Sequence, residues 1–259
     1  LMKVKFTILG CGSSLGVPRI DGYFGNCNPN NKRNYRTRCS ALITLNNVNI
    51  LIDTSPDLKK QLLMSGIKNI NNVFYTHNHA DQSHGINELR VFALKNKNKI
   101  PVFADRNTKK YLFNSFKYCF KSDNDSYKPI LQFMKFKKNI NISCGSKKIS
   151  IKNIPVKHGK INSLAYIINN KCAYLPDVNK IYPKDIKSFK KLSYLVIDCL
   201  QYDHHPSHFS LNEVLKLVKI LKPKKTILTN LNNQIDYNII KKQIPNNVFP
   251  AYDGMSFYL

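Results

Sequence analysis

Three histidines and an aspartate fall within ten residues in the stretch THNHADQSHG, from Thr76 to Gly85. His77 and His79 are separated by one residue at the end of a run that favours a β-strand, so their side chains point the same way. Asp81 continues this alternation. Imidazole suits zinc, iron or nickel, and a carboxylate adds charge for a harder ion. The stretch predicts a metal site, although a polar surface loop would have a similar composition.

Three further candidate residues follow apolar runs elsewhere in the chain. His158 lies in IPVKHGK, Asp177 in AYLPDV and Asp53 in ILIDTSPD. A carboxylate that follows a buried strand is well placed to accept a hydrogen bond from a ligand histidine, and we expect this role for Asp53. Together these residues strengthen the prediction of a metal site.

The elements that must position these residues alternate between strands and helices. Alternating or apolar runs predict strands at residues 3–10, 40–45, 49–53, 72–76, 149–156, 163–168, 172–175, 192–198 and 226–229. Helices are predicted after Pro56, over residues 84–95, 108–120 and 237–243, and after Ser210, where SLNE offers a capping box with Glu213. This order predicts an α/β (α+β) protein with sheet layers covered by helices, in a single domain over residues 1–259.

A glycine-rich segment, GCGSSLG, follows the first predicted strand and invites comparison with a dinucleotide fingerprint. Its spacing is GxGxxxG, and Val17 and Pro18 stand where a helix would have to begin. We therefore expect a tight loop here.

Composition limits the classes of partner. The net charge of +26 raises nucleic acid as a partner, but only six of the 41 basic residues are arginine and the lysines are scattered along the chain. We expect no nucleic-acid docking stripe, and a solvated loop for the local cluster KRNYRTR, Lys32 to Arg38. No apolar run approaches the roughly 20 residues of a membrane span, and no signal peptide is evident. Seven scattered cysteines suggest buried, reduced thiols, and we expect a cytoplasmic protein.

Taken together, these residues resemble the metallo-β-lactamase superfamily, whose pattern is THxHxDH followed by a single histidine, a bridging aspartate and a last histidine. The resemblance covers nearly the whole chain, through GCGSSLGVP, LIDTSPDLKKQLL, HGINELR, HHPSHFSL and PAYDGM. It is greatest to the branch that contains phosphoribosyl 1,2-cyclic phosphate phosphodiesterase. The resemblance implies a four-layer αββα sandwich of two mixed sheets with outer helices.

The same resemblance implies two metal ions, most often zinc. His77, His79 and His158 would hold the first. Asp177 would bridge to a second, which Asp81, the residue after it and a late histidine would also bind.

This chain departs from the pattern at two ligand positions of the second ion. The residue after Asp81 is Gln82, and we place the late position at Asn232. Amide oxygens are neutral, weak ligands, so zinc would lose more of its hold than manganese or magnesium. Three states stay open: an enzyme with one metal, an enzyme with a loosely held second manganese or magnesium ion, or a fold without catalysis. His84 is a weaker candidate for a replacement ligand.

A second group of histidines occurs in DHHPSH, just before the Ser210 cap. In related phosphodiesterases a histidine ahead of a small hydroxyl residue and a helix protonates the leaving oxygen, and His208 matches that pattern best. His205 is a second candidate and His204 a weaker one. The alternative is that these side chains only cap or pack against the helix.

We therefore predict a metal-dependent hydrolase that acts on a small cyclic phosphate or a nucleotide-like phosphodiester, with Asp81, His208 and His205 as catalytic candidates. One alternative is a nuclease similar to the tRNA 3′-processing enzymes, and another is a non-catalytic binding protein that keeps the fold and one metal. The expected partner is a small phosphodiester; a homodimer is an open question, and no membrane contact is expected.

Overall fold

The computed structural model describes residues 3–122 and 128–259 and contains two seven-stranded sheets. The first sheet has the strand order β14 (Ser256–Tyr258), β1 (Lys5–Gly10), β2 (Ser40–Leu45), β3 (Val48–Ile52), β4 (Asn72–Phe74), β5 (Ile100–Phe103) and β6 (Leu131–Phe133). The second has the order β13 (Val248–Pro250), β12 (Lys225–Thr229), β11 (Tyr194–Asp198), β10 (Cys172–Leu175), β9 (Ile161–Ile168), β8 (Lys147–His158) and β7 (Asn139–Cys144).

Both sheets are mixed, and strand direction decides which residues gather at one edge. In the first sheet β3, β4, β5 and β6 run parallel, and β1 runs the same way because two antiparallel steps separate it from β3. In the second sheet β10 to β13 run parallel, and β8 shares their direction for the same reason. The carboxyl ends of these strands therefore lie at one edge of each sheet.

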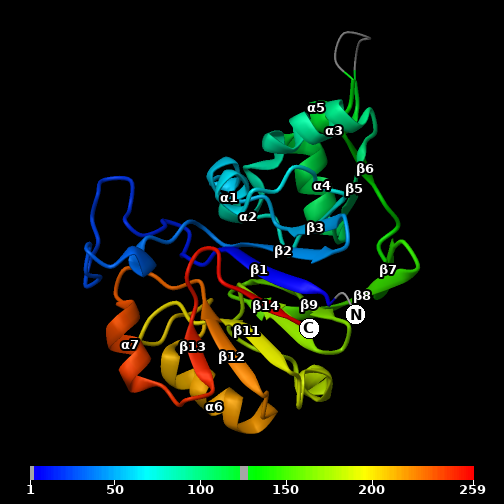
Figure 1. Ribbon diagram of the computed structural model, residues 1–259. Helices are drawn as coiled ribbons and strands as arrows, with labels where there is room; N and C mark the ends of the chain where they lie inside the picture. Colours follow the sequence, from blue (N-terminus) through cyan, green and yellow to red (C-terminus); the bar gives the residue numbers. More distant parts are fainter. Residues whose placement is uncertain (1–2, 123–127) are drawn as a thin grey trace.

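Helices cover the outer face of each sheet and complete four layers (Figure 1). The helices beside the first sheet are α1 (Leu58–Ser65), α2 (Ala80–Ser83), α3 (Arg90–Asn96), α4 (Arg106–Ser115) and α5 (Lys117–Phe120), and those beside the second are α6 (Leu211–Leu221) and α7 (Tyr237–Gln243). Short 3₁₀ turns span Lys32–Asn34, Ile86–Leu89 and Pro183–Phe189.

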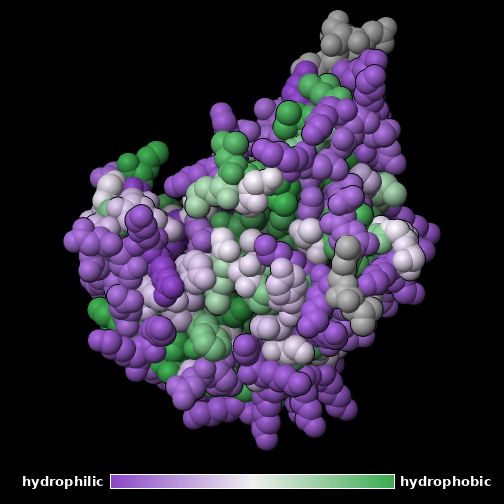
Figure 2. Space-filling model, in the orientation of Figure 1, coloured by the Kyte–Doolittle hydropathy of each residue, from purple (hydrophilic) through white to green (hydrophobic). Residues whose placement is uncertain are grey.

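Three hydrophobic clusters join the layers. The central cluster lies between the sheets and includes Phe6 from β1, Phe74 from β4 and Tyr174 from β10. A second cluster packs α6 on its sheet through Val214 and Val218, and a third packs α1, α3 and α4 on the other. Hydrophilic side chains cover much of the face shown in Figure 2, as expected for a chain this rich in lysine.

The predicted four-layer fold and a strand at each of the nine predicted places are confirmed. Five short strands escaped prediction: β5, β6, β7, β13 and β14. The helix expected at residue 84 begins with a 3₁₀ turn and becomes α-helical only at Arg90, and the helix expected over residues 108–120 breaks at Phe116. GCGSSLG forms a tight loop in which the Gly16 N–H donates to the Ser13 carbonyl at 2.8 Å. All seven cysteines are buried and unpaired, and no helix in residues 3–122 or 128–259 is long and apolar enough to cross a bilayer.

The capping box at the start of α6 gives a direct test of how the fold is stabilised. Its hydrogen bonds are present: the Glu213 N–H donates to Ser210 Oγ, and the Ser210 N–H donates to the Glu213 carboxylate at 2.8 Å. We expect Ser210→Ala to lower the free energy of unfolding by about 1 kcal/mol, measured by urea denaturation. Asn212→Ala, an exposed change two residues later, should cost much less, and equal costs would contradict the role of the cap.

The cap should also show a defined dependence on pH. Burial raises the pKa of Glu213, but its bonds to Ser210 and the nearby His204 outweigh that effect and hold the pKa below its ordinary value. The carboxylate therefore adds stability above the unfolded pKa of about 4.3, and that contribution is lost as the pH falls through the lower folded value. The cost of Ser210→Ala should shrink over the same acidic range.

Candidate metal centre and its surroundings

Three histidines meet where the two sheets come together. His77 and His79 follow β4, and His158 ends β8. Their ring centroids lie 4.5 to 5.1 Å apart, and one nitrogen of each ring lies within 4.8 Å of the others. Burial lowers the pKa of His77 well below its ordinary value and that of His158 to about 4, so both rings stay neutral and keep a lone pair. This histidine triad, which is the predicted first metal site, is therefore assembled in the fold.

The donor set fits a divalent metal ion. The Nε2 atom of His77 is buried and has no hydrogen-bond partner, which is costly unless an ion or water accepts its lone pair. Three neutral imidazoles in a cluster are a common zinc set that leaves a position open for water.

Asp53 supports this cluster through an intermediate residue. Its carboxylate is 0% exposed and accepts the Thr76 N–H at 2.7 Å and the Thr76 hydroxyl at 2.8 Å. Because that hydroxyl donates to Asp53, it is left to accept from Nδ1 of His77, 3.0 Å away. This arrangement leaves the Nε2 lone pair of His77 free for a metal. The expectation of a direct bond from a ligand histidine to Asp53 is wrong, because Thr76 stands between them.

A second group lies beside the triad and consists of His158, Asp177 and His208. Asp177 follows β10, and the Nδ1 atom of His208 is 4.0 Å from its Oδ1. The same Nδ1 donates to Asp198 Oδ2 at 2.6 Å. Burial opposes charge on the imidazole, but the Asp198 and Asp177 carboxylates outweigh it and raise the pKa of His208 to about 9. His208 is thus a protonated donor that faces the triad.

Asp198 was missed by the sequence analysis. It ends β11, is fully buried and also accepts the Val178 N–H at 2.9 Å. The signal was present, because an aspartate closes the apolar run YLVID just as Asp53 closes ILID.

Two side-chain amides complete the surroundings of Asp177. Gln82 Nε2 donates to Asp177 Oδ2 at 2.9 Å and lies 3.4 Å from Asp81 Oδ2. Asn230 Nδ2 lies 3.3 Å from both Asp177 Oδ1 and Asp198 Oδ1. The amide in the late position is therefore Asn230 and not Asn232, whose side chain bonds instead to Gln201 and to the N–H of Gln234.

The remaining histidines lie at the margin. His205 accepts the Ser207 N–H at 3.3 Å and lines the cavity, with its ring 5.1 Å from that of His208. His204 is 75% exposed along its side chain and pairs with Glu213. His84 bonds to Tyr111 on α4 at 3.0 Å and belongs to neither metal-binding group.

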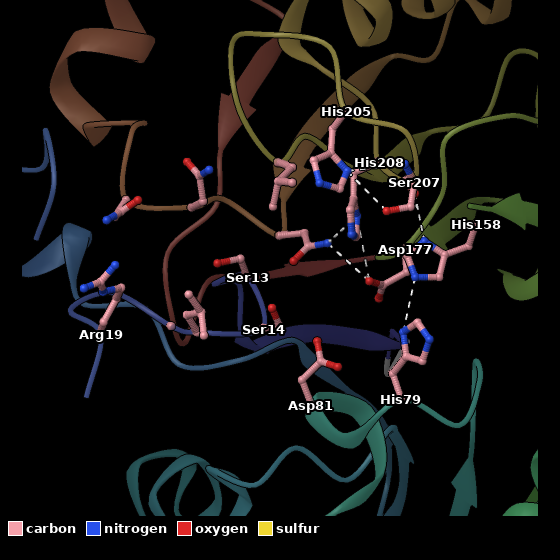
Figure 3. Close-up of a pocket in the computed structure, with 16 residues that line it drawn as sticks. Ser13, Ser14, Arg19, His79, Asp81, His158, Asp177, His205, Ser207 and His208 are labelled. Atoms are coloured by element: carbon pink, nitrogen blue, oxygen red, sulfur yellow. Dashed lines mark hydrogen bonds and ion pairs between the residues drawn. The ribbon is translucent and has the colours of Figure 1, made fainter. Parts of the chain in front are cut away.

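One end of a cavity of about 320 Å³ is lined by residues of the two groups and their neighbours: His79, Asp81, His158, Asp177, His205, His208 and Asn230 (Figure 3). The far end is formed by the loop after β1 and the loop after β12, with Ser13, Ser14, Arg19, Asn232 and Asn233. Arg36, expected in a solvated loop, is instead 2% exposed and donates to the carbonyls of Asn232 at 3.1 Å and Ile235 at 2.7 Å. It holds the second of these loops in place.

Comparisons with known proteins agree with this fold. A family model for the beta-lactamase superfamily domain matches residues 48–229. A crystal structure of a diphosphatase from the PhnP family superposes with a TM-score of 0.89 at 27% identity, covering 100% of this chain and 98% of that one. The structure of zinc-bound PqqB from Methylobacterium extorquens has a TM-score of 0.75 at 15% identity, covering 98% of this chain and 100% of that one, a likeness of fold alone.

A curated relative extends beyond this chain. The octanoyltransferase of Porphyromonas gingivalis is 27% identical over 255 residues, which are 97% of this chain and 51% of that protein. The chain thus spans about half the length of this relative. The family model, by contrast, lies wholly within the chain, covers most of it and contains the three histidines and Asp177. The chain belongs to the metallo-β-lactamase superfamily and has the fold of the hydrolases in that superfamily.

Proposed function

We propose that this chain is a metal-dependent hydrolase of phosphoric esters that acts on a small cyclic phosphate, a nucleotide-like phosphodiester or a related diphosphate. One observation carries the proposal: the three clustered histidines lie beside the His208–Asp198 pair at one end of a cavity, whose wall includes His79, His158 and His208. The full-length likeness to a PhnP-family diphosphatase at 27% identity supports the choice of phosphorus chemistry.

His77, His79 and His158 would hold the ion, with the carboxylates of Asp81 and Asp177 beside it. A zinc ion bound there would supply water with a pKa near 7 and would polarise a phosphoryl oxygen. Side chains of the protein orient the attacking water and supply the proton for the leaving group. Asp81 is half-buried at the cavity wall and can accept a hydrogen bond from the attacking water, which orients it toward phosphorus.

His208 is the proton donor for the leaving oxygen. Because its Nδ1 donates to Asp198, its Nε2 is the atom left to face the cavity and give up a proton. Asp198 fixes the ring orientation and stabilises its charged form. His205 lies beside His208 and is a candidate for contact with the leaving group.

Two other functions are each favoured by one feature of the chain. The charge of +26 favours a nuclease, but a cavity of about 320 Å³ suits a small ligand, and a nuclease would bind RNA with steep dependence on salt. The amides Gln82 and Asn230 favour a non-catalytic protein, which would bind a metal without turnover.

Removal of one triad histidine should strongly weaken both metal binding and hydrolysis. We expect His79→Ala to lower zinc affinity and the turnover of a bis-aryl phosphodiester by about 100-fold or more, because two imidazoles hold zinc poorly. Elemental analysis and a steady-state assay measure the two effects. The matched control is His84→Ala, which changes a histidine outside the cluster and should retain both. Full activity in His79→Ala would contradict the proposal.

The role of His208 can be tested through the leaving group. His208→Gln should lower kcat by about 100- to 10,000-fold for an alkyl or nucleoside leaving group, which needs a proton. The loss should be small for p-nitrophenolate, which leaves without one. An equal loss for both substrates would show that His208 acts in binding or folding instead. Asp198→Asn should follow the same pattern with a smaller effect.

A further inference from the structure

Asp177 is held from two sides by amide hydrogens. It is 2% exposed, and its two oxygens accept from different side chains: Oδ2 from Gln82 at 2.9 Å and Oδ1 from Asn230 at 3.3 Å. A buried carboxylate needs compensation for the water it has lost. Here two neutral amides, each with its positive end toward the carboxylate, supply part of that compensation.

Both amides are fixed in place by further contacts. Gln82 is 0% exposed, and its backbone carbonyl accepts the Thr54 N–H at 2.8 Å, which ties α2 to the segment after β3. Asn230 is 1% exposed, has a φ of +60°, and its Nδ2 also donates to the Pro176 carbonyl at 3.0 Å. Neither side chain has solvent into which it could swing.

The carboxylates of Asp177 and Asp81 also decide which end of the Gln82 amide faces inward. Gln82 Nε2 lies between Asp177 and Asp81, and its Oε1 is buried with no partner. A reversed amide would set Oε1 against two carboxylates, so the N–H end is favoured at this position. The amide therefore acts as a donor to Asp177 and not as an oxygen ligand for a cation.

The group formed by His158, Asp177 and His208 has the spacing of a metal site, but both oxygens of Asp177 and the Nδ1 atom of His208 already form hydrogen bonds. Both oxygens of Asp177 face N–H groups, and Nδ1 of His208 carries the proton that it donates to Asp198. A cation placed there would lie against three hydrogen atoms that carry partial positive charge. The residues present do not fit a second ion.

We propose that Gln82 and Asn230 are positioning residues that take the place of a second cation on Asp177, so that the chain holds one divalent ion, at His77, His79 and His158. This inference rests on the metal-dependent function proposed above. It is decided by counting ions, which does not require turnover.

The experiment is a metal count on the purified chain and on a double variant, Gln82→His with Asn230→His. Zinc per chain is measured by elemental analysis after dialysis and by isothermal titration. We expect one ion in the native chain and two in the double variant, whose imidazoles would replace the N–H groups with lone pairs. The matched control is Asn232→His, which adds a histidine to the same cavity away from Asp177 and should stay at one.

The outcomes separate the inference from the function. Two ions of similar affinity in the native chain would overturn the inference and leave hydrolysis intact. One ion in a folded double variant would overturn it as well, because the amides would not be what excludes the second ion. One ion in the native chain and two in the double variant, with no turnover of any phosphodiester, would support the inference and overturn the function.

If the double variant does not fold, a measurement on the native chain still tests the inference. The chain is loaded with one equivalent of zinc and titrated with Mn²⁺, a paramagnetic ion that broadens nearby resonances. The side-chain amide signals of Gln82 and Asn230 in a ¹⁵N-labelled sample should persist through at least two added equivalents. Selective loss of these two signals at one equivalent would place an ion on Asp177 and overturn the inference.

Discussion

Face-to-face packing of the two sheets is the constraint on which the site depends. The central cluster of Phe6, Phe74 and Tyr174 brings the sheets together, and two hydrogen bonds link them beside the site. The Tyr166 hydroxyl donates to the Tyr75 carbonyl at 2.6 Å, and the Leu164 N–H donates to the Thr76 carbonyl at 2.9 Å. Because the strands that carry site residues run in one direction within each sheet, their carboxyl ends meet across this junction. Residues far apart in sequence thereby share one cavity.

Buried carboxyl groups at that junction are stabilised by local donors and not by the protein's large positive charge. Asp53 accepts from Thr76, Asp177 from Gln82 and Asn230, and Asp198 from His208 and Val178. The lysines that give the net charge of +26 line none of this end of the cavity. Short hydrogen bonds in a region of low dielectric are stronger and more directional than distant surface charges. The composition of the chain therefore says little about its site.

The sequence predicted what depends on local pattern and missed what depends on the arrangement of strands. His77 and His79 could be found because strand alternation places them on one side, and the Ser210 cap because its spacing is fixed. An aspartate at the end of YLVID marks Asp198 as a candidate, but the roles of Asp198 and Asn230 arise only when β10, β11 and β12 lie side by side. The two-residue error at Asn232 has the same origin: β12 ends at Thr229, and the left-handed conformation of Asn230 turns that side chain toward Asp177. Short strands such as β13 are too brief for a pattern to develop.

The Asn230 amide links the number of metal ions in the site to its need for a proton donor. Its Nδ2 lies 3.3 Å from both Asp177 Oδ1 and Asp198 Oδ1, and 3.1 Å from Nδ1 of His208. A second cation would stabilise the negative charge that develops on a leaving oxygen. Where an amide stands in its place, that charge has to be neutralised by a proton. His208, with its pKa raised to about 9 by the carboxylates around it, can supply that proton. A site with one cation and a strongly held imidazolium therefore depends more on proton donation than a site with two cations, and it favours substrates whose leaving oxygen accepts a proton.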